Sequence, residues 1–193
     1  MKPHIFFSDF FGISTEVVED AGFLDISLIN DLPVFVDPFL LFNSVTPTYQ
    51  DLHVDIIRYM RFLKERTLVG GLSPGLVDAW FTFPEVRQNW LGFSQTGNRG
   101  HGLGRDFARG LQKGFRSVFK DFGEEQITHG SHLEKLTLLR DGVGRDTISD
   151  FTTNLIKGYL ADRTQEFAQQ FLPDHLRRRV MVPKVAFAQS KKG

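Results

Sequence analysis

A cluster of glycines followed by a two-faced helical pattern constrains this chain more than any other feature. Four glycines fall within eight residues, where they permit sharp turns and a close approach of the backbone to a ligand. Basic and large apolar residues then each recur every three or four positions, which predicts one helix with a basic face and an opposite apolar face. The basic series is Arg105, Arg109, Lys113, Arg116 and Lys120, and the apolar series is Phe107, Leu111, Phe115, Val118 and Phe122.

A glycine loop that leads into a helix N-terminus favours anion binding, and a row of basic residues can extend such a site along a phosphate chain. The spacing fits neither a Walker loop nor a dinucleotide fingerprint, because Arg105 and Asp106 follow the last glycine and the glycines are too evenly spaced. The alternative is a flexible loop before a helix whose charged face is solvated. The predicted phosphate-binding residues are Arg99, Gly100, Gly102, Gly104, Arg105, Arg109 and Lys113.

A second glycine turn, at 141–146, precedes a long helix that the pattern places over 148–171. Asp146, Asp150, Asn154 and Lys157 step by four, four and three positions, so they share one helix face. Carboxylate and amide oxygens hold Mg²⁺ or Mn²⁺, and a nearby lysine can balance the charge of a scissile phosphate. We therefore predict catalytic roles for Asp146, Asp150 and Lys157.

The same two aspartates also have a simpler interpretation, because acidic residues stabilise a helix N-terminus, and Ser149 or Asp150 could serve as its N-cap. Two further carboxylates, Asp37 and Glu85, follow apolar runs and are predicted to complete the metal site with Asp146 and Asp150. The spacing of Asp37 and Glu85 in the sequence does not by itself require a metal site.

Other kinds of chemistry find little support in the residues. The chain has no cysteine, which excludes disulfides and thiolate catalysis. A zinc site at His129, His132 and Glu134 is not favoured, because no third histidine is close. The nucleophile elbow and the zinc-protease helix motif are absent, and Leu133-Glu134-Lys135 lacks the intervening residue of a typical nuclease strand motif.

Charge is distributed unevenly, although the formal net charge of the 193 residues is zero. Residues 1–57 hold nine acidic residues and one basic residue, a net charge of −8. Residues 99–120 and 174–193 each hold six basic residues and one acidic residue, a net charge of +5. This segregation predicts either nucleic acid on one face, an acidic partner, or neutralisation within the molecule.

The predicted fold class is α+β, or α/β: a single mixed-sheet domain over 1–173 with two or three long amphipathic helices, followed by a basic C-terminal segment over 174–193. The 20 phenylalanines are expected to build most of its core. Helices are expected over about 49–67 and 148–171, and the glycine loop and the basic helix together occupy about 97–120. Strands are expected over 24–29, 33–42, 133–139 and 177–188, and 77–83 and 90–93 are expected to be short strands or a buried loop.

Several of these patterns together resemble a family of longer, functionally unassigned bacterial proteins. They are Asp37-Pro38-Phe39-Leu40-Leu41, Phe83-Pro84-Glu85, Gly102-Leu103-Gly104, and the Gly144-x-Asp146-x-Ile148-Ser149-Asp150-x-Thr152-x-Asn154 run. The resemblance covers about 30–170 and brings no catalytic residues with it. It implies that the chain is a shortened member, and it implies an association with prokaryotic antiviral defence.

Two functions follow as hypotheses. The first is a hydrolase, a Mg²⁺- or Mn²⁺-dependent phosphodiesterase or nuclease that acts on nucleic acid. The helix face from Asp146 to Lys157 favours it, because it carries more polar side chains than capping alone requires. The second is a non-catalytic binding or assembly subunit that docks a protein partner, a second copy or nucleic acid. No apolar run is long enough for a membrane span or a signal peptide, so a cytoplasmic location is expected.

Overall fold

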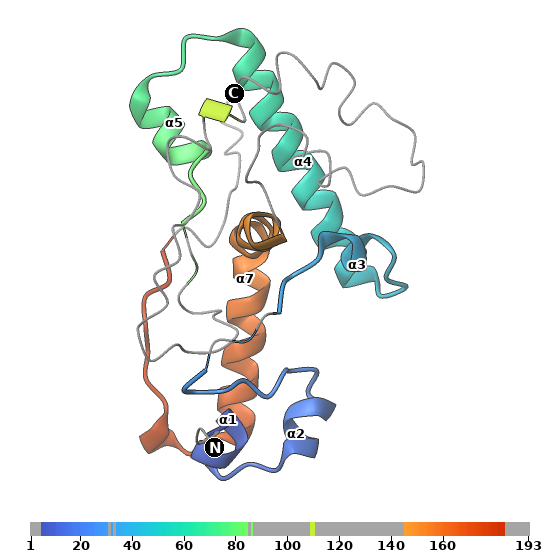
Figure 1. Cartoon of the computed structure of the whole chain (residues 1–193), viewed down its shortest axis with the longest axis vertical. Coiled ribbons are helices and arrows are strands. Elements are labelled where there is room, and N and C mark those ends of the chain that lie inside the picture. The colour runs from blue at the N-terminus through green and yellow to red at the C-terminus, as the bar shows by residue number, and fades with distance from the viewer. Residues whose placement is uncertain are drawn as a thin grey trace. The chain divides into compact units, whose positions relative to one another are not determined.

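The computed structural model describes residues 5–30, 32, 34–84, 86, 109–110 and 145–183, with the backbone alone at 146 and 147. The chain divides into two compact units (Figure 1). Unit 1 comprises Met1–Val34, Val86–Gly100 and Lys157–Val185, and unit 2 comprises Phe35–Glu85, His101–Ile156 and Ala186–Gly193. Because helix α7 (Arg145–Phe171) contributes to both units, the predicted extent of one domain over 1–173 stays a prediction.

Unit 1 begins with two short helices, α1 (Phe7–Phe11) and α2 (Thr15–Asp20). The carboxylate of Asp25 holds the start of α1, since it accepts hydrogen bonds from the backbone N–H and the hydroxyl of Ser8 at 3.0 and 2.6 Å. Gly12 ends α1 in the left-handed conformation, with φ of 64°, which costs a glycine nothing. The hydroxyl of Ser14 then caps α2 by accepting the N–H of Val17.

The second half of α7 forms the aromatic centre of unit 1. Phe167 is buried, and its ring lies 6.0 Å from that of Phe7, 5.0 Å from that of Phe23 and 4.9 Å from that of Phe171. These separations are typical of favourable ring pairs. The prediction that phenylalanines build the core therefore holds for this cluster. A short helical turn, η3 (Asp174–Leu176), follows α7.

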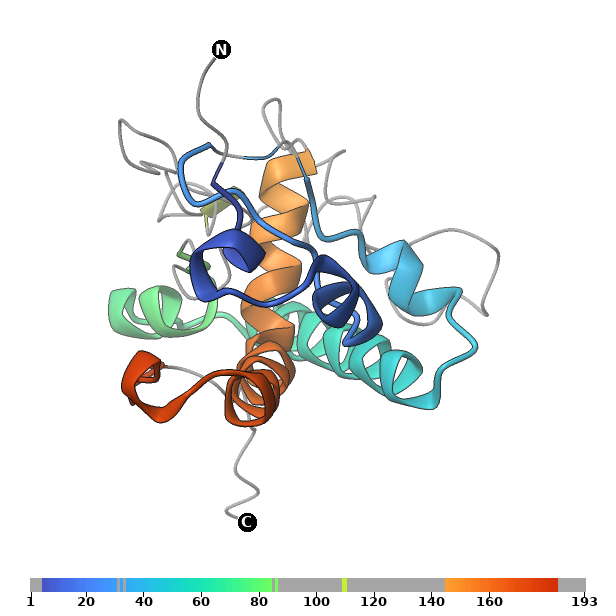
Figure 2. The ribbon, with the colours of Figure 1, turned by 90° about the horizontal axis from the view of Figure 1, so that it is seen from below.

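Unit 2 contains α3 (Pro38–Phe42), α4 (Pro47–Val69) and α5 (Pro74–Trp80). Helices α3 and α4 lie side by side in both views (Figures 1 and 2), and the ring of Phe42 is 5.0 Å from that of His53. The apolar face of α4 is buried at Ile56, Met60 and Leu63. This confirms the long helix expected over 49–67.

The core of unit 2 is completed by aromatic side chains that follow α5. Phe81 and Phe83 are fully buried, and the ring of Phe83 meets that of Phe151 on α7 edge-on at 4.5 Å. The hydroxyl of Tyr59 donates a 2.7 Å hydrogen bond to the carbonyl oxygen of Trp80. Burial raises the pKa of that hydroxyl well above its ordinary value.

The predicted mixed-sheet α+β fold is wrong, because the described residues are mainly helical and form no sheet. Over 24–29, where a strand is expected, the structure has only an isolated bridge that pairs Ser27 with Phe6. The strand expected over 33–42 is overturned by α3, in which Asp37 caps a helix whose first residue is Pro38. Over 77–83, where a short strand or a buried loop is expected, residues 77–80 instead belong to α5, which Ser73 caps before Pro74.

The corrections at α3 and α5 share one physical reason. A capping side chain before proline satisfies the first free N–H groups and fixes φ for a helix, and this local signal outweighs the β propensity of the residues that follow. Residues 177–182 are neither helix nor strand, so the part of the strand expected over 177–188 that is described is also wrong. Residues 90–93 and the strand expected over 133–139 lie outside the described residues.

Candidate functional site

The predicted catalytic residues all fall within α7. This helix confirms the one expected over 148–171, although it already includes Arg145. Because the helix already includes Arg145, neither Ser149 nor Asp150 is its N-cap. Ser149 instead accepts a 2.9 Å hydrogen bond from the backbone N–H of Val36 through its buried hydroxyl. This bond brings the chain segment before Asp37 to the first half of α7.

The expected polar face of α7 is not solvated in the structure. Asn154 is 1 % exposed, and its side-chain nitrogen donates to the carbonyl oxygens of Pro84 at 2.7 Å and Asp150 at 2.9 Å. Lys157 is also buried, although the polar residues were expected to lie opposite the buried Phe151. Both sides of this stretch of α7 are therefore packed, and Asn154 has a structural role.

The structure does not bring the four predicted metal-binding carboxylates together among the described residues. Asp37 is exposed, and its carboxylate accepts the N–H of Phe39 at 2.9 Å as the cap of α3. Glu85 and the side chain of Asp146 lie outside the described residues. Within the described part of the chain, no three His, Cys, Asp or Glu side chains are grouped closely enough to hold a metal ion.

The predicted phosphate-binding loop falls almost entirely outside the described residues. Arg99, Gly100, Gly102, Gly104, Arg105 and Lys113 all do so, as do the histidines at 129 and 132. Arg109 is described, and it is helical and exposed, as the basic helix expected within 97–120 requires at that position.

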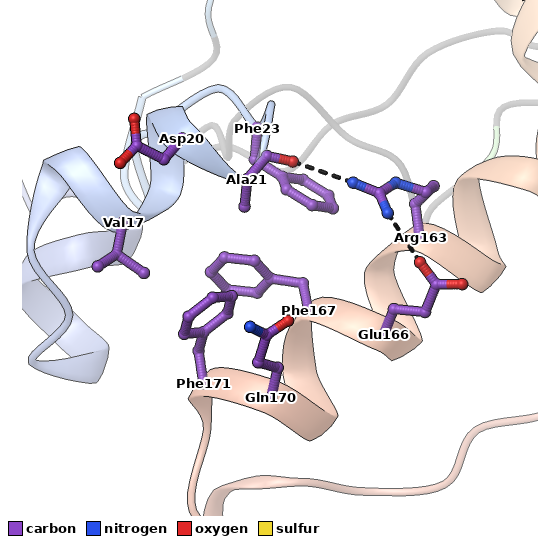
Figure 3. A pocket seen from close by; sticks show the side chains of 9 residues that line it. All are labelled: Val17, Asp20, Ala21, Phe23, Arg163, Glu166, Phe167, Gln170 and Phe171. Atoms are coloured by element: carbon purple, nitrogen blue, oxygen red, sulfur yellow. Dashed lines mark hydrogen bonds and ion pairs between the residues drawn. The ribbon is translucent and has the colours of Figure 1, made fainter.

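A pocket that the sequence did not predict lies in unit 1, between α2 and the second half of α7 (Figure 3). Its volume is about 370 Å³, at the lower end of the range of ligand pockets. The apolar lining residues are Val17, Ala21, Phe23, Phe167 and Phe171, and the polar ones are Asp20, Arg163, Glu166 and Gln170.

Arg163 joins the two walls of this pocket. Its guanidinium donates to the carbonyl oxygen of Ala21 at the end of α2, at 3.2 Å, and to the carboxylate of Glu166 at 2.8 Å (Figure 3). A cation at a helix C-terminus satisfies a free carbonyl and interacts favourably with the helix dipole. Arg163 is thus held in place by the fold at the edge of the pocket.

Helix α2 is strongly acidic, and the second half of α7 carries two carboxylates beside Arg163. Their exposed carboxylates are Glu16, Glu19, Asp20, Asp162 and Glu166. Hydrogen bonds with its own backbone and with the Ser14 side chain lower the pKa of the Glu16 carboxyl, which keeps it ionised at neutral pH. Arg163 offsets only part of this charge. The pocket therefore combines an apolar floor with a negative rim, which suits an apolar side chain that has a basic neighbour.

The sequence contained one signal for this site, the net charge of −8 over residues 1–57. It could not show that α2 meets α7, because the hydrogen bond between Ala21 and Arg163 spans 142 positions. None of the described helices is both long and apolar enough to span a membrane.

The described part of the chain thus defines a helical protein with a small acidic and apolar pocket. Over residues 12–192 it matches the family described as Domain of unknown function (DUF8370), and the chain belongs to that family. Its membership of a family without an assigned function, which the motif resemblance implied, is thereby confirmed. No curated protein and no solved structure matches the chain.

Proposed function

We propose that this protein is a non-catalytic binding and assembly module that holds a segment of a protein partner in the pocket between α2 and α7. The observation that carries the proposal is the combination of an apolar floor and an acidic rim in that pocket. We place its action in the bacterial cytoplasm, as the sequence analysis expects.

The pocket supplies two separate contributions to binding. Burying one large apolar side chain against Phe23, Phe167 and Phe171 is worth about 1.5–3 kcal/mol. Glu166 is paired with Arg163, so the exposed carboxylate of Asp20 at the rim is the one that attracts a basic segment, raises its association rate and disfavours acidic competitors. Such a site gives weak to moderate affinity and prefers basic partner segments over acidic ones.

A metal-dependent nuclease is the competing hypothesis, and it stays a prediction. One observation favours it: the hydrogen bond from Val36 to Ser149 places the segment that carries Asp37 beside the helix that carries Asp150. The capping role of Asp37 speaks against a metal ligand there. A direct test of cleavage is given in the Discussion.

Peptide binding tests the proposed function. Fluorescence anisotropy is measured with three labelled peptide sets: basic with apolar residues, basic without apolar residues, and acidic with apolar residues. We expect the first set to bind in the micromolar range, and Ala21→Arg, which fills the pocket and adds positive charge, to weaken this binding at least about tenfold.

Ala79→Arg is the matched control, because Ala79 is an exposed helical residue on α5 that does not line the pocket. It should leave the affinity within about twofold. Circular dichroism and thermal melting should confirm that both variants fold. Equal binding by all three peptide sets, or binding that Ala21→Arg leaves unchanged, would overturn the proposal.

A further inference from the structure

We infer that the pocket receives the segment Arg178–Val182 of a second copy of this chain. The inference rests on the proposed function, and it names the partner. Both surfaces belong to unit 1, so each copy carries one pocket and one segment.

The segment is free to bind another molecule. It follows η3, where Arg177 has extended backbone angles of −98° and 140°, and it continues as a drawn-out stretch (red in Figure 1). Val180 is 70 % exposed and Met181 is 91 % exposed. Among the described residues, Arg178 and Arg179 have no hydrogen bond or ion pair, whereas Arg177 is paired with Asp174.

Its chemistry is complementary to that of the pocket. Three consecutive arginines precede Val180, Met181 and Val182, so positive charge lies directly beside exposed apolar side chains. The pocket presents the reverse arrangement: the exposed carboxylate of Asp20 lies at its rim, where Glu166 is already paired with Arg163, and its floor is apolar. Opposite charges and matching apolar surfaces favour this pair over association of like with like.

An extended backbone determines which side chains can act together. Residues two positions apart project to the same side and lie about 6.5–7 Å apart along the strand. Arg179 and Met181 therefore share one side of the segment. Met181, an adaptable apolar side chain, enters the pocket, while Arg179 meets the carboxylate of Asp20 at its rim.

The segment of the same copy does not fill this pocket, because no residue of 177–183 is among those that line it. Two copies can instead exchange segments reciprocally, which gives a closed two-fold dimer in which the contact forms twice. One short segment buries far less than the about 1,200–2,000 Å² of a typical stable interface. We therefore expect a dimer that is concentration-dependent and weakened by salt.

Sedimentation velocity of the full chain tests the inference over a wide range of concentrations at low and high salt. We expect wild-type chains to dimerise at high concentration, and Met181→Asp to weaken dimerisation at least about tenfold. Val45→Asp is the matched control, since Val45 is 93 % exposed and lies in unit 2. Because both side chains are almost fully exposed, neither substitution should affect folding.

Charge reversal makes the test specific. Asp20→Arg and Arg179→Glu should each abolish dimerisation alone, because each places like charges at the contact. Mixing the two variants should restore a dimer, because the exchanged charges then pair at one contact and the native charges pair at the other. A monomer at every wild-type concentration, or a dimer that Met181→Asp and charge reversal leave unchanged, would overturn the inference.

The outcome also separates this inference from the proposed function. If wild-type chains stay monomeric while basic apolar peptides still bind in a manner that Ala21→Arg abolishes, the pocket binds a different protein and only the inference fails. If neither the peptides nor a second copy binds, both fail.

Discussion

The side chain of Asn154 donates a 2.7 Å hydrogen bond to the carbonyl oxygen of Pro84, a residue seventy positions earlier in the chain. A second bond from the same nitrogen, at 2.9 Å, reaches the carbonyl oxygen of Asp150 within α7. The sequence pattern placed Asn154 on a metal-binding face. In the structure its amide joins the segment after α5 to a buried position in the first half of α7.

Asn154→Ala should lower the free energy of unfolding by about 1–3 kcal/mol, because it removes the bond to Pro84 and leaves a gap at a position that is 1 % exposed. Urea denaturation measures this change. Asn43→Ala is the control, since the amide of Asn43 also donates to a carbonyl oxygen four positions earlier, that of Phe39, but at an exposed site. It should cost less than about 0.5 kcal/mol, and equal costs would contradict a structural role for Asn154.

Asp25→Ala should destabilise unit 1 by about 1–3 kcal/mol, because the N–H and the hydroxyl of the buried Ser8 both lose their acceptor. A double-mutant cycle with Ser8→Ala should show coupling between the two residues. The control is Asp9→Ala, which removes an exposed acceptor for the N–H of Phe6. Additive effects of the Asp25 and Ser8 substitutions would show that this bond does not stabilise α1.

Tyr59→Phe should change how stability depends on alkaline pH. Burial raises the pKa of Tyr59 in the folded chain, whereas in the unfolded chain it ionises near pH 10. Its contribution is therefore fully present below about pH 10 and is lost as the pH rises further. Urea denaturation from neutral to alkaline pH should show a shallower decline for Tyr59→Phe than for the wild type.

The same variant has an opposite effect at neutral pH. There Tyr59→Phe loses the hydrogen bond to Trp80, at a cost of about 0.5–1.5 kcal/mol. The stability curves of the variant and the wild type should therefore converge as the pH rises. Parallel curves would contradict a raised pKa at Tyr59.

The long helices could be predicted from the sequence because their apolar spacing is regular. On α4, Ile56, Met60 and Leu63 recur at helical intervals and are buried as expected. The short helices α3 and α5 could not be predicted in this way, since one or two turns show no periodicity. Their start signals were present as Asp37-Pro38 and Ser73-Pro74, but the first of these falls inside the strand that was expected over 33–42.

The candidate site was harder to predict for a different reason. Periodicity assigns one buried face to a helix, but Asn154 and Lys157 are buried as well as Phe151, because α7 is packed on more than one side. The pocket depends on an approach of α2 to α7 that nothing in the local sequence encodes. Only the acidic character of its rim could be seen in advance.

Nuclease activity provides the last prediction, and the proposed non-catalytic function leads us to expect none. Labelled single- and double-stranded DNA and RNA are incubated with the chain in Mg²⁺, in Mn²⁺ and in EDTA. Asp146→Ala and Asp150→Ala remove the predicted ligands, and Asp162→Ala, an exposed carboxylate on the same helix, is the matched control. Metal-dependent cleavage that is lost in Asp150→Ala but kept in Asp162→Ala would establish a metal site on α7 and contradict the non-catalytic proposal. Cleavage that all variants share would indicate a contaminating nuclease, because substitutions at the predicted site should not leave catalysis unchanged.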